Sequence, residues 1–213
     1  MAKPASPLVF VVDDDVHLRE ALRNLFESVG MCVELFGSTS ELLVRLAKGT
    51  SESCLVLDIR LPGVSGLDFQ NQLAKVGNNI PIVFITGHGD VPMSVRAMKA
   101  GATDFLTKPF RDQDMLDAVS IALTLDRSRR AVEDEVSALM TRYESLTMRE
   151  RQVLALVTTG LMNKQIAGEL GVSEITVKIH RGHVMEKMGV RTLAELVKGY
   201  ETILPHLKTD DPT

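Results

Sequence analysis

The sequence lacks the features that would place this chain in a membrane or hold it together by disulfides. Its apolar runs are far shorter than the roughly 18 residues of a membrane span, and no basic stretch followed by an apolar one opens it. Its two cysteines, Cys32 and Cys54, both lie in apolar strand-like runs, so we expect buried free thiols. Two cysteines alone also cannot build a structural zinc site. We therefore expect a cytoplasmic chain that does not enter the membrane.

Charge is unevenly distributed along the 213 residues, a length that favours two small domains. Residues 1–123 carry 11 Lys and Arg against 15 Asp and Glu, whereas residues 147–208 carry 9 against 6. Residues 124–146 carry 4 against 5, and two aspartates lie in an acidic tail, 209–213. An acidic first part and a mildly basic second part favour two separate roles, the second involving nucleic acid.

Short apolar runs alternate with helical patterns in the first part of the chain. We expect five strands, at residues 8–12, 32–36, 54–57, 80–85 and 104–106. Helical periodicity and capping residues indicate helices at 16–29, 38–49, 65–76, 90–100 and from about 112. This alternation predicts an α/β fold, a doubly wound parallel five-stranded sheet.

Polar residues follow the carboxyl ends of these strands, which meet at one edge of a parallel sheet. They are Asp13, Asp14, Asp58, Thr86 and Lys108. Each has an ordinary alternative: Asp58 could open the Pro-Gly turn that comes after it, and the first aspartates could cap the next helix. Together, however, three converging carboxylates would repel one another unless a cation such as Mg²⁺ lay among them. A hydroxyl and an ammonium suit phosphoryl oxygens, so the set predicts that Asp58 accepts phosphate.

Residues 8–123 resemble the receiver domain of two-component response regulators. The matching features are Asp13-Asp14, Asp58-x-x-x-Pro62-x-x-x-Gly66, Thr86, Phe105 and Lys108-Pro109. The resemblance implies a flavodoxin-like fold with strand order 2-1-3-4-5 and a cis peptide bond before Pro109. A further stretch is similar to the FixJ-like subgroup, namely Thr86-Gly87-His88-Gly89-Asp90-Val91-Pro92-Met93.

The same resemblance implies roles for these residues. The ligands of Mg²⁺ would be Asp14, Asp58, the backbone carbonyl of Arg60 and, through water, Asp13. Thr86 would close on the phosphoryl group, and Phe105 would turn inward at the same time. Many relatives have Tyr at that position, so a hydrogen bond from its hydroxyl is not available to this chain.

The helix expected from about residue 112 should continue through a linker at 124–145, because no glycine or proline occurs between Phe110 and Gly160. Apolar residues recur there at spacings of four and three, namely Val132, Val136, Leu139, Tyr143 and Leu146. This seam fits either a short coiled coil or a linker helix that packs on the chain's own domains. Both alternatives predict a long helical linker.

Residues 146–208 carry the pattern of an all-α helix-turn-helix domain. The expected caps and turns are a capping box at Thr147-x-x-Glu150, an N-cap at Asn163, a tight turn at Gly171 and an N-cap at Ser173. A fourth helix is expected at 193–200. The domain resembles the LuxR-type DNA-binding domain at Leu146-Thr147-x-x-Glu150, Asn163-Lys164-x-Ile166-Ala167 and Val177-x-x-His180.

The longer helix, which ends at Met188, would be the one that meets DNA. Its buried face is expected to carry Val177, Val184 and Met188, and an exposed Ile179 on the opposite side suits a thymine methyl group. A plain amphipathic helix with one stray isoleucine is the alternative. The residues expected to contact DNA are Ser173, Thr176, Lys178, Ile179, Arg181, Gly182 and His183.

Together the resemblances imply a transcriptional response regulator of the FixJ/NarL type. A sensor histidine kinase would donate phosphate to Asp58, residues 91–111 would become a homodimer face, and the second domain would bind promoter DNA and act with RNA polymerase. Residues 160–181 are also similar to regulators of styrene and related aromatic catabolism. The chain would have no enzymatic activity beyond Mg²⁺-dependent self-phosphorylation and slow self-dephosphorylation.

Two other functional classes stay open at this point. A phosphatase of the haloacid dehalogenase type also uses an aspartyl nucleophile, but it needs a second Asp two residues later, where this chain has Arg60. A pure interaction module would not take phosphate, and the full set of acids with Thr86 and Lys108 argues against it.

Overall fold

The computed structural model describes residues 6–87 and 91–207. Within those ranges, no helix is both long enough and apolar enough to cross a membrane. Several residues named from the sequence lie outside them: His88, Gly89 and Asp90 of the FixJ-like stretch, and the acidic tail 209–213.

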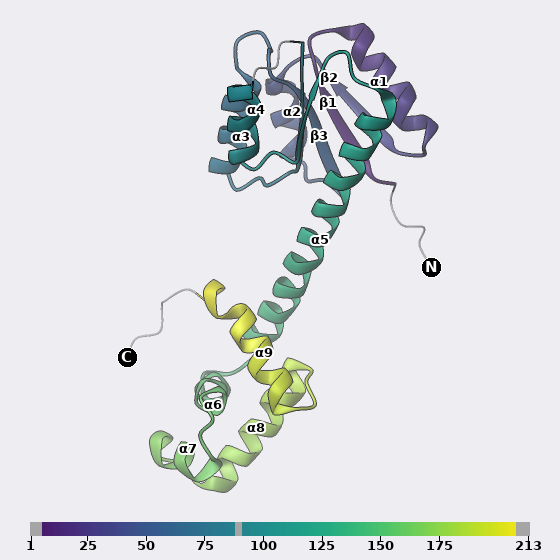
Figure 1. Cartoon of the computed structure of the whole chain (residues 1–213). Helices are drawn as coiled ribbons and strands as arrows, with labels where there is room; N and C mark the ends of the chain where they lie inside the picture. The colour runs from purple at the N-terminus through teal and green to yellow at the C-terminus, as the bar shows by residue number, and fades with distance from the viewer. Residues whose placement is uncertain (1–5, 88–90, 208–213) are drawn as a thin grey trace. The chain divides into compact units, whose positions relative to one another are not determined.

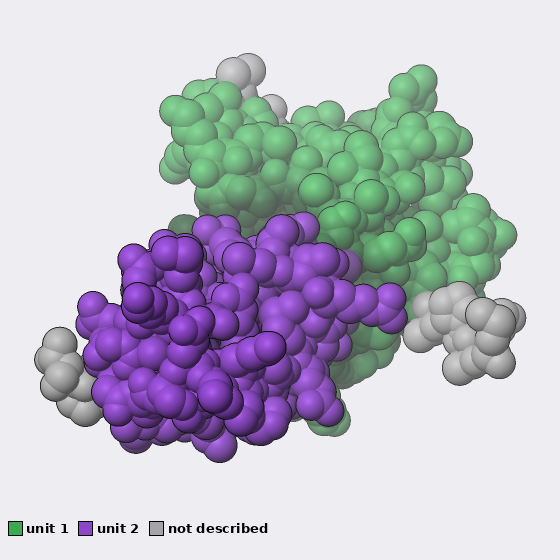
Figure 2. All heavy atoms as spheres, turned by 90° about the horizontal axis from the view of Figure 1, so that it is seen from below, with its two compact units in different colours: residues 1–130 green, residues 131–213 purple. Residues whose placement is uncertain are grey.

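The chain forms two compact units, which divide between Arg130 and Ala131 (Figure 2). We call residues 1–130 the receiver unit and residues 131–213 the C-terminal unit. The division falls inside the stretch 124–145 that the sequence indicates as a linker, so each unit takes part of that stretch.

The receiver unit is built on a sheet of five parallel strands in the order β2-β1-β3-β4-β5 (Figure 1). The strands are β1 (Leu8–Val12), β2 (Cys32–Phe36), β3 (Ser53–Asp58), β4 (Ile82–Thr86) and β5 (Asp104–Thr107). This is the expected order. In the register of the sheet, Val12 pairs with Leu57 and Asp58 pairs with Ile85, so the carboxyl ends of the three central strands form one edge.

Helices cover both faces of this sheet (Figure 1). They are α1 (Val16–Ser28), α2 (Thr39–Leu46), α3 (Gly66–Lys75), α4 (Val91–Lys99) and α5 (Asp112–Glu144). Neighbouring residues of β3 point to opposite faces: Leu55 packs with Phe69 of α3, and Val56 packs with Phe26 of α1 and Val119 of α5. Burial on both sides, worth about 1.5–3 kcal/mol for each large apolar side chain, explains the unbroken apolar runs of the central strands.

The two cysteines differ in exposure. Cys54, on the central strand β3, is buried and free, as expected. Cys32 is also free but exposed, so the expectation of two buried thiols is wrong for this residue. The reason is its position: it begins β2, which is an edge strand of the sheet and is only partly covered.

Helix α5 runs without interruption for 33 residues, which confirms the expected continuation of this helix. Its middle is fixed to the receiver unit by Asp126, whose buried carboxylate accepts a hydrogen bond from Ser53 N at 2.9 Å. Arg129 and Arg130 donate to the same carboxylate, and Arg130 also donates to the carbonyl of Thr50 at 2.8 Å. The receiver unit therefore extends past residue 123, to Arg130.

The last turns of α5 pack on the C-terminal unit instead. Leu139 and Tyr143 lie against its core, and Leu146 is buried within it. Arg142 donates to the carbonyl of Met188 at 3.1 Å. This part of the apolar seam therefore follows the second alternative, packing on the chain's own unit, whereas Val132 is 59% exposed.

The C-terminal unit is a small helical bundle (Figure 1). It contains α6 (Met148–Thr158), α7 (Asn163–Leu170), α8 (Glu174–Met188), α9 (Leu193–Ile203) and a 3₁₀ turn, η1 (Leu204–His206). Val153, Leu154, Ile166, Val184 and Leu196 are among its buried residues.

The local signals that shape this bundle are mostly those read from the sequence. The capping box of Thr147 and Glu150 is present, and Gly171 ends α7 in the left-handed conformation at φ 65°. Asn163, however, is not the N-cap of α7 but its first helical residue. Met162 precedes the helix, and its carbonyl accepts from Gln165 N at 2.9 Å, so the N–H that a capping side chain would satisfy is already bonded.

Candidate functional site

Three aspartates converge at the carboxyl edge of the sheet. Asp13 follows β1 and is fully buried, Asp58 ends β3 and is 5% exposed, and Asp14 is exposed. One carboxylate oxygen from each lies within 4.8 Å of the others. We call Asp13, Asp14 and Asp58 the acidic cluster. The sequence expectation that strand ends bring these acids together is met.

Lys108 provides the positive charge of this site. Its Nζ atom lies 2.6 Å from Oδ2 of Asp13 and 2.7 Å from Oδ2 of Asp58. The residue follows β5, and its backbone N–H donates to the carbonyl of Thr86 at 2.8 Å. The peptide bond between Lys108 and Pro109 is cis, as expected. One lysine thus bridges two of three acids, which leaves an excess of negative charge.

The remaining oxygens of the two buried acids are held by backbone. Oδ1 of Asp58 accepts from Arg60 N at 2.9 Å, and Oδ1 of Asp13 accepts from Asp15 N at 2.8 Å. Because each carboxylate has one oxygen on the backbone and one on Lys108, its orientation is fixed before any ligand arrives.

Burial acts in opposite directions on the pKa values of Asp13 and Lys108. Burial raises the pKa of Asp13 above its usual value, although the hydrogen bonds from Lys108 and Asp15 oppose the change. Burial alone would lower the pKa of Lys108, but its bonds to Asp13 and Asp58 outweigh it and raise that pKa. Lys108 is therefore an ammonium at neutral pH.

Gly66 sets how closely α3 approaches β3, the strand that ends in Asp58. A Cβ atom at this position would lie 2.7 Å from the carbonyl oxygen of Asp58 and 3.0 Å from Cα of Ile59. Both neighbours are backbone atoms and cannot turn away, so only glycine fits at the start of this helix. The spacing between Asp58 and Gly66 in the sequence has this steric cause.

The two expected switch residues lie on neighbouring strands. Thr86 is fully buried at the end of β4, and Phe105 is half-buried on β5, packed against the core that faces α3 and α4. In the register of these strands Phe105 pairs with Phe84, two residues before Thr86.

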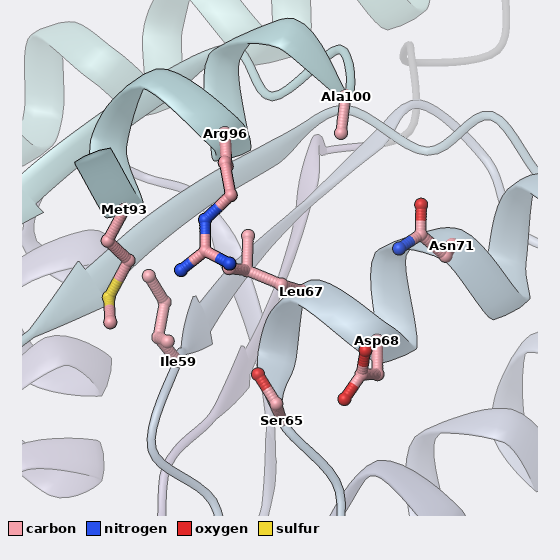
Figure 3. Close-up of a pocket in the computed structure, with 8 residues that line it drawn as sticks. All are labelled: Ile59, Ser65, Leu67, Asp68, Asn71, Met93, Arg96 and Ala100. Carbon is pink, nitrogen blue, oxygen red and sulfur yellow. The ribbon is translucent and has the colours of Figure 1, made fainter.

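Two hollows lie beside the acidic cluster. One, of about 300 Å³, lies between α3 and α4, and Figure 3 shows Arg96 of α4 extending toward Ile59 and Leu67. The other, of about 530 Å³, lies between α1 and the start of α5; it is lined by Leu18, Leu22, Leu25, Lys108, Pro109 and Phe110 among others. Neither hollow contains Asp58, but each borders a residue next to it or bonded to it.

The acidic cluster fits a small, hard divalent cation. Its donors are carboxylate oxygens, the ligand type that Mg²⁺ prefers, and the exposed Asp14 leaves an open side for a cation with its water. The backbone carbonyl of Arg60, the remaining expected ligand, belongs to the turn whose N–H already orients Asp58.

On α8, the residues expected to meet DNA fall into two groups. Lys178, Ile179 and Gly182 are exposed on the side opposite the buried Val177 and Val184, with Ile179 53% exposed. The expected buried face is confirmed.

The other group already has partners within the protein. The hydroxyls of Ser173 and Thr176 are 2.8 Å apart, and Ser173 caps the helix as expected. Arg181 donates to Oδ1 of Asn163 at 3.1 Å, and Nδ1 of His183 lies 3.5 Å from Oε1 of Glu150.

One exposed residue of this face was missed from the sequence. Ile175 is 73% exposed and lies one turn before Ile179, so two isoleucines share the exposed side of α8. Their i, i+4 spacing was the available signal.

Two family models match the chain. The model of the response regulator receiver domain matches residues 9–120, and that of the luxR family of bacterial regulatory proteins matches residues 144–199. The chain is 58% identical over 196 residues to nodulation protein W of Bradyrhizobium diazoefficiens, covering 92% of this chain and 86% of that protein. It is 47% identical over 201 residues to the response regulator protein TodT of Pseudomonas putida, covering 94% and 88%.

Solved structures agree with these matches. The structure of the response regulator StyR has a TM-score of 0.81 at 52% identity, covering 92% of this chain and 99% of that chain. Full-length FixJ from B. japonicum has a TM-score of 0.55 at 36% identity, covering 94% and 98%.

The chain therefore belongs to the two-component response regulators. It joins a receiver domain to a LuxR-type DNA-binding domain and is a transcriptional regulator of the FixJ-like kind, as the sequence implied.

Proposed function

We propose that Asp58 takes a phosphoryl group from a sensor histidine kinase and that this event controls promoter binding by α8. The observation that carries the proposal is the pair of bonds from Lys108 to Asp13 and Asp58, at 2.6 and 2.7 Å, inside an acidic cluster that still has excess negative charge. The excess negative charge of such a site attracts a cation, and its lysine can bind the oxygens of an incoming phosphoryl group.

The chemistry follows from this arrangement. A carboxylate oxygen of Asp58 forms a bond to phosphorus while the bond from phosphorus to the donor's imidazole nitrogen breaks, and the proton of the neutral imidazole comes from solvent. Asp14, Asp58, the backbone carbonyl of Arg60 and, through water, Asp13 would hold Mg²⁺, which would supply positive charge at the phosphoryl oxygens. Lys108 and Thr86 bind the remaining oxygens from the protein side.

The only reactions of the receiver unit are this transfer and the hydrolysis of its own acyl phosphate, so the chain is no enzyme toward other substrates. The apolar hollow beside Lys108, lined by Leu18, Leu22 and Phe110, offers the kinase a docking surface next to the acceptor.

Phosphorylation controls DNA binding through dimerisation. The segment 91–111 follows Thr86 in the chain and includes Lys108, and its helix α4 carries Val95 and Met98, which are 44% and 45% exposed. Thr86 and Lys108 bias this surface when they bind the phosphoryl group, and two copies then pair through it. A dimer places two α8 helices on paired half-sites in the cytoplasm, where the regulator acts with RNA polymerase.

The experiment that tests the acceptor is labelling with acetyl phosphate. The full chain with Mg²⁺ should gain one phosphoryl group by intact mass, and Asp58→Asn should gain none. Asp68→Asn, which removes an exposed carboxylate from the first turn of α3, is the matched control and should label normally. Equal labelling of wild type and Asp58→Asn would refute the assignment.

The experiment that tests the dimer uses the phosphoryl mimic beryllofluoride. Sedimentation of the wild type at tens of micromolar, about the weak end of signalling affinities, should show a dimer only with the mimic. Val95→Glu should prevent it. A wild type that stays monomeric with the mimic would exclude this route to DNA.

A further inference from the structure

We propose that the C-terminal unit carries a second metal site, for a divalent transition metal of the Zn²⁺ type, formed by Glu150 of α6 with His180 and His183 of α8. One ligand atom from each of these residues lies within 4.8 Å of the others. The site lies in a different unit from the acidic cluster, and its ligand chemistry is different.

The spacing of the ligands suits a tetrahedral ion. Ligand atoms around Zn²⁺ with bonds of about 2.0–2.1 Å lie about 3.4 Å apart. Nδ1 of His183 already lies 3.5 Å from Oε1 of Glu150. The two histidines are three residues apart on one helix, which places them on the same face, and their rings meet edge to face at 6.5 Å between centroids. The third ligand is thus within the reach of a side-chain rotation.

His180 has an unused ring nitrogen. Its Nδ1 atom is buried and has no hydrogen-bond partner among the described residues. A buried polar atom without a partner destabilises the fold unless another group satisfies it. A metal ion between His180 and Glu150 offers this side chain a partner that the protein itself does not.

Lys187 is the strongest objection, because it brings positive charge to the same carboxylate. Its Nζ atom lies 2.6 Å from Oε2 of Glu150, and Thr147 N donates to that same oxygen at 2.8 Å. Both contacts leave Oε1, the oxygen that faces His183. They hold the carboxylate in one orientation, which is the usual role of the groups that surround a metal ligand.

Glu150 is also ionised, as a metal ligand must be. Burial alone would raise its pKa, but the hydrogen bonds from Lys187 and Thr147 outweigh burial and lower that pKa to about 2. Two imidazoles and one carboxylate favour Zn²⁺, Co²⁺ or Ni²⁺ over Mg²⁺ and Ca²⁺, which prefer oxygen alone. Water fills the fourth position, since the side chain of His183 is 53% exposed.

Metal binding at this site would affect how α8 binds DNA. It ties α8, whose exposed face carries Lys178 and Ile179, to α6. It also engages His183, one of the residues that the sequence assigns to DNA contact. This inference does not depend on phosphate transfer to Asp58.

The test is a titration of the full chain with Co²⁺, followed by visible absorption, in an excess of Mg²⁺ that occupies the acidic cluster. Wild type should develop the strong bands of four-coordinate Co²⁺. His183→Ala should weaken Co²⁺ affinity by at least about tenfold, the smallest usual loss for even an outer-shell change. His206→Ala, an exposed histidine of η1, is the matched control and should bind as wild type does.

A second measurement reads the same unit independently. Tyr143 and Tyr200 are the only tyrosines, both belong to the C-terminal unit, and the chain has no tryptophan, so tyrosine fluorescence follows the melting of that unit alone. Zn²⁺ should raise its Tm in wild type and in His206→Ala but not in His183→Ala. Equal Co²⁺ affinity in both variants, or wild type without bands, would overturn the proposal.

Discussion

Each unit of this chain holds a lysine against buried carboxylate, and the two pairs behave differently. In the receiver unit Lys108 is shared by Asp13 and Asp58, with Asp14 exposed beside them. In the C-terminal unit Lys187 serves one acid, Glu150, whose carboxylate also completes the capping box of α6. The first site has more negative than positive charge, whereas the second is balanced.

The pKa values follow this balance. Burial raises the pKa of Asp13 in the crowded site, whereas the pKa of Glu150 falls to about 2 because its lysine and backbone bonds outweigh burial. A buried carboxylate with its own cation is held in its ionised form, whereas one that shares a cation is protonated more readily. Charge balance, more than burial, therefore separates the two sites.

Replacing Lys187 and Lys108 should give the largest difference in stability between the two units. Lys187→Met leaves Glu150 buried without a counter-charge, and we expect the C-terminal unit to lose about 3 kcal/mol of unfolding free energy. Tyrosine fluorescence during urea unfolding measures it. Lys198→Met, an exposed lysine of α9, should change little.

The corresponding change in the receiver unit is Lys108→Met. Its destabilisation should be largely reversed by Mg²⁺, because the cation can replace the lost ammonium in the acidic cluster. Calorimetry with and without Mg²⁺ checks it. If Mg²⁺ stabilised Lys187→Met equally well, the proposed contrast between a lysine shared by two acids and a lysine paired with one acid would be wrong.

Acid should affect the C-terminal unit next most strongly. The pKa of Glu150 falls from its ordinary value of 4.5 to about 2 in the folded chain, so its contribution to stability is fully present above about pH 4.5 and is lost as pH falls toward 2. Allowing for solvent screening, we expect a loss on the order of 2 kcal/mol, measured by tyrosine fluorescence with a chelator present. Glu150→Gln should flatten this dependence. An unchanged slope in that variant would show that another group titrates.

The smallest effect should come from the exposed face of α8. Lys178→Ala should weaken binding to the specific promoter site by at least about 1 kcal/mol if the side chain reads a base, and should reduce the salt slope if it meets phosphate. Ile175→Ala tests the neighbouring exposed turn. Footprinting at two salt concentrations separates these outcomes. Neither variant should alter phosphorylation, since both lie outside the receiver unit.

The sheet and its site could be predicted because their causes are local or topological. Apolar runs mark the strands, and a parallel sheet brings Asp13, Asp58 and Thr86 to one edge wherever the helices lie. The predictions are wrong where a residue's exposure or hydrogen bonding depends on a partner elsewhere in the fold. Cys32 is exposed because β2 lies at the edge of the sheet, which the apolar run CVELF does not reveal.

Two other differences have the same origin. Gln165 satisfies the backbone before α7, so Asn163 is free to accept from Arg181 instead of capping the helix. The receiver unit extends to Arg130 because Asp126 bonds to Ser53, which lies 73 residues away in the sequence. Sequence periodicity showed that α5 continues, but it could not show which residues of α5 belong to which unit.

The two cysteines differ in exposure, so the rate of thiol modification can measure how often the central strand opens. Cys54 lies on β3, four residues before Asp58, fully buried and with a pKa raised chiefly by burial, whereas Cys32 is exposed. A thiol reagent should therefore modify Cys32 promptly and reach Cys54 only when β3 opens to solvent. The slow phase of thiol modification thus reports how often the strand that carries Asp58 leaves its place in the sheet.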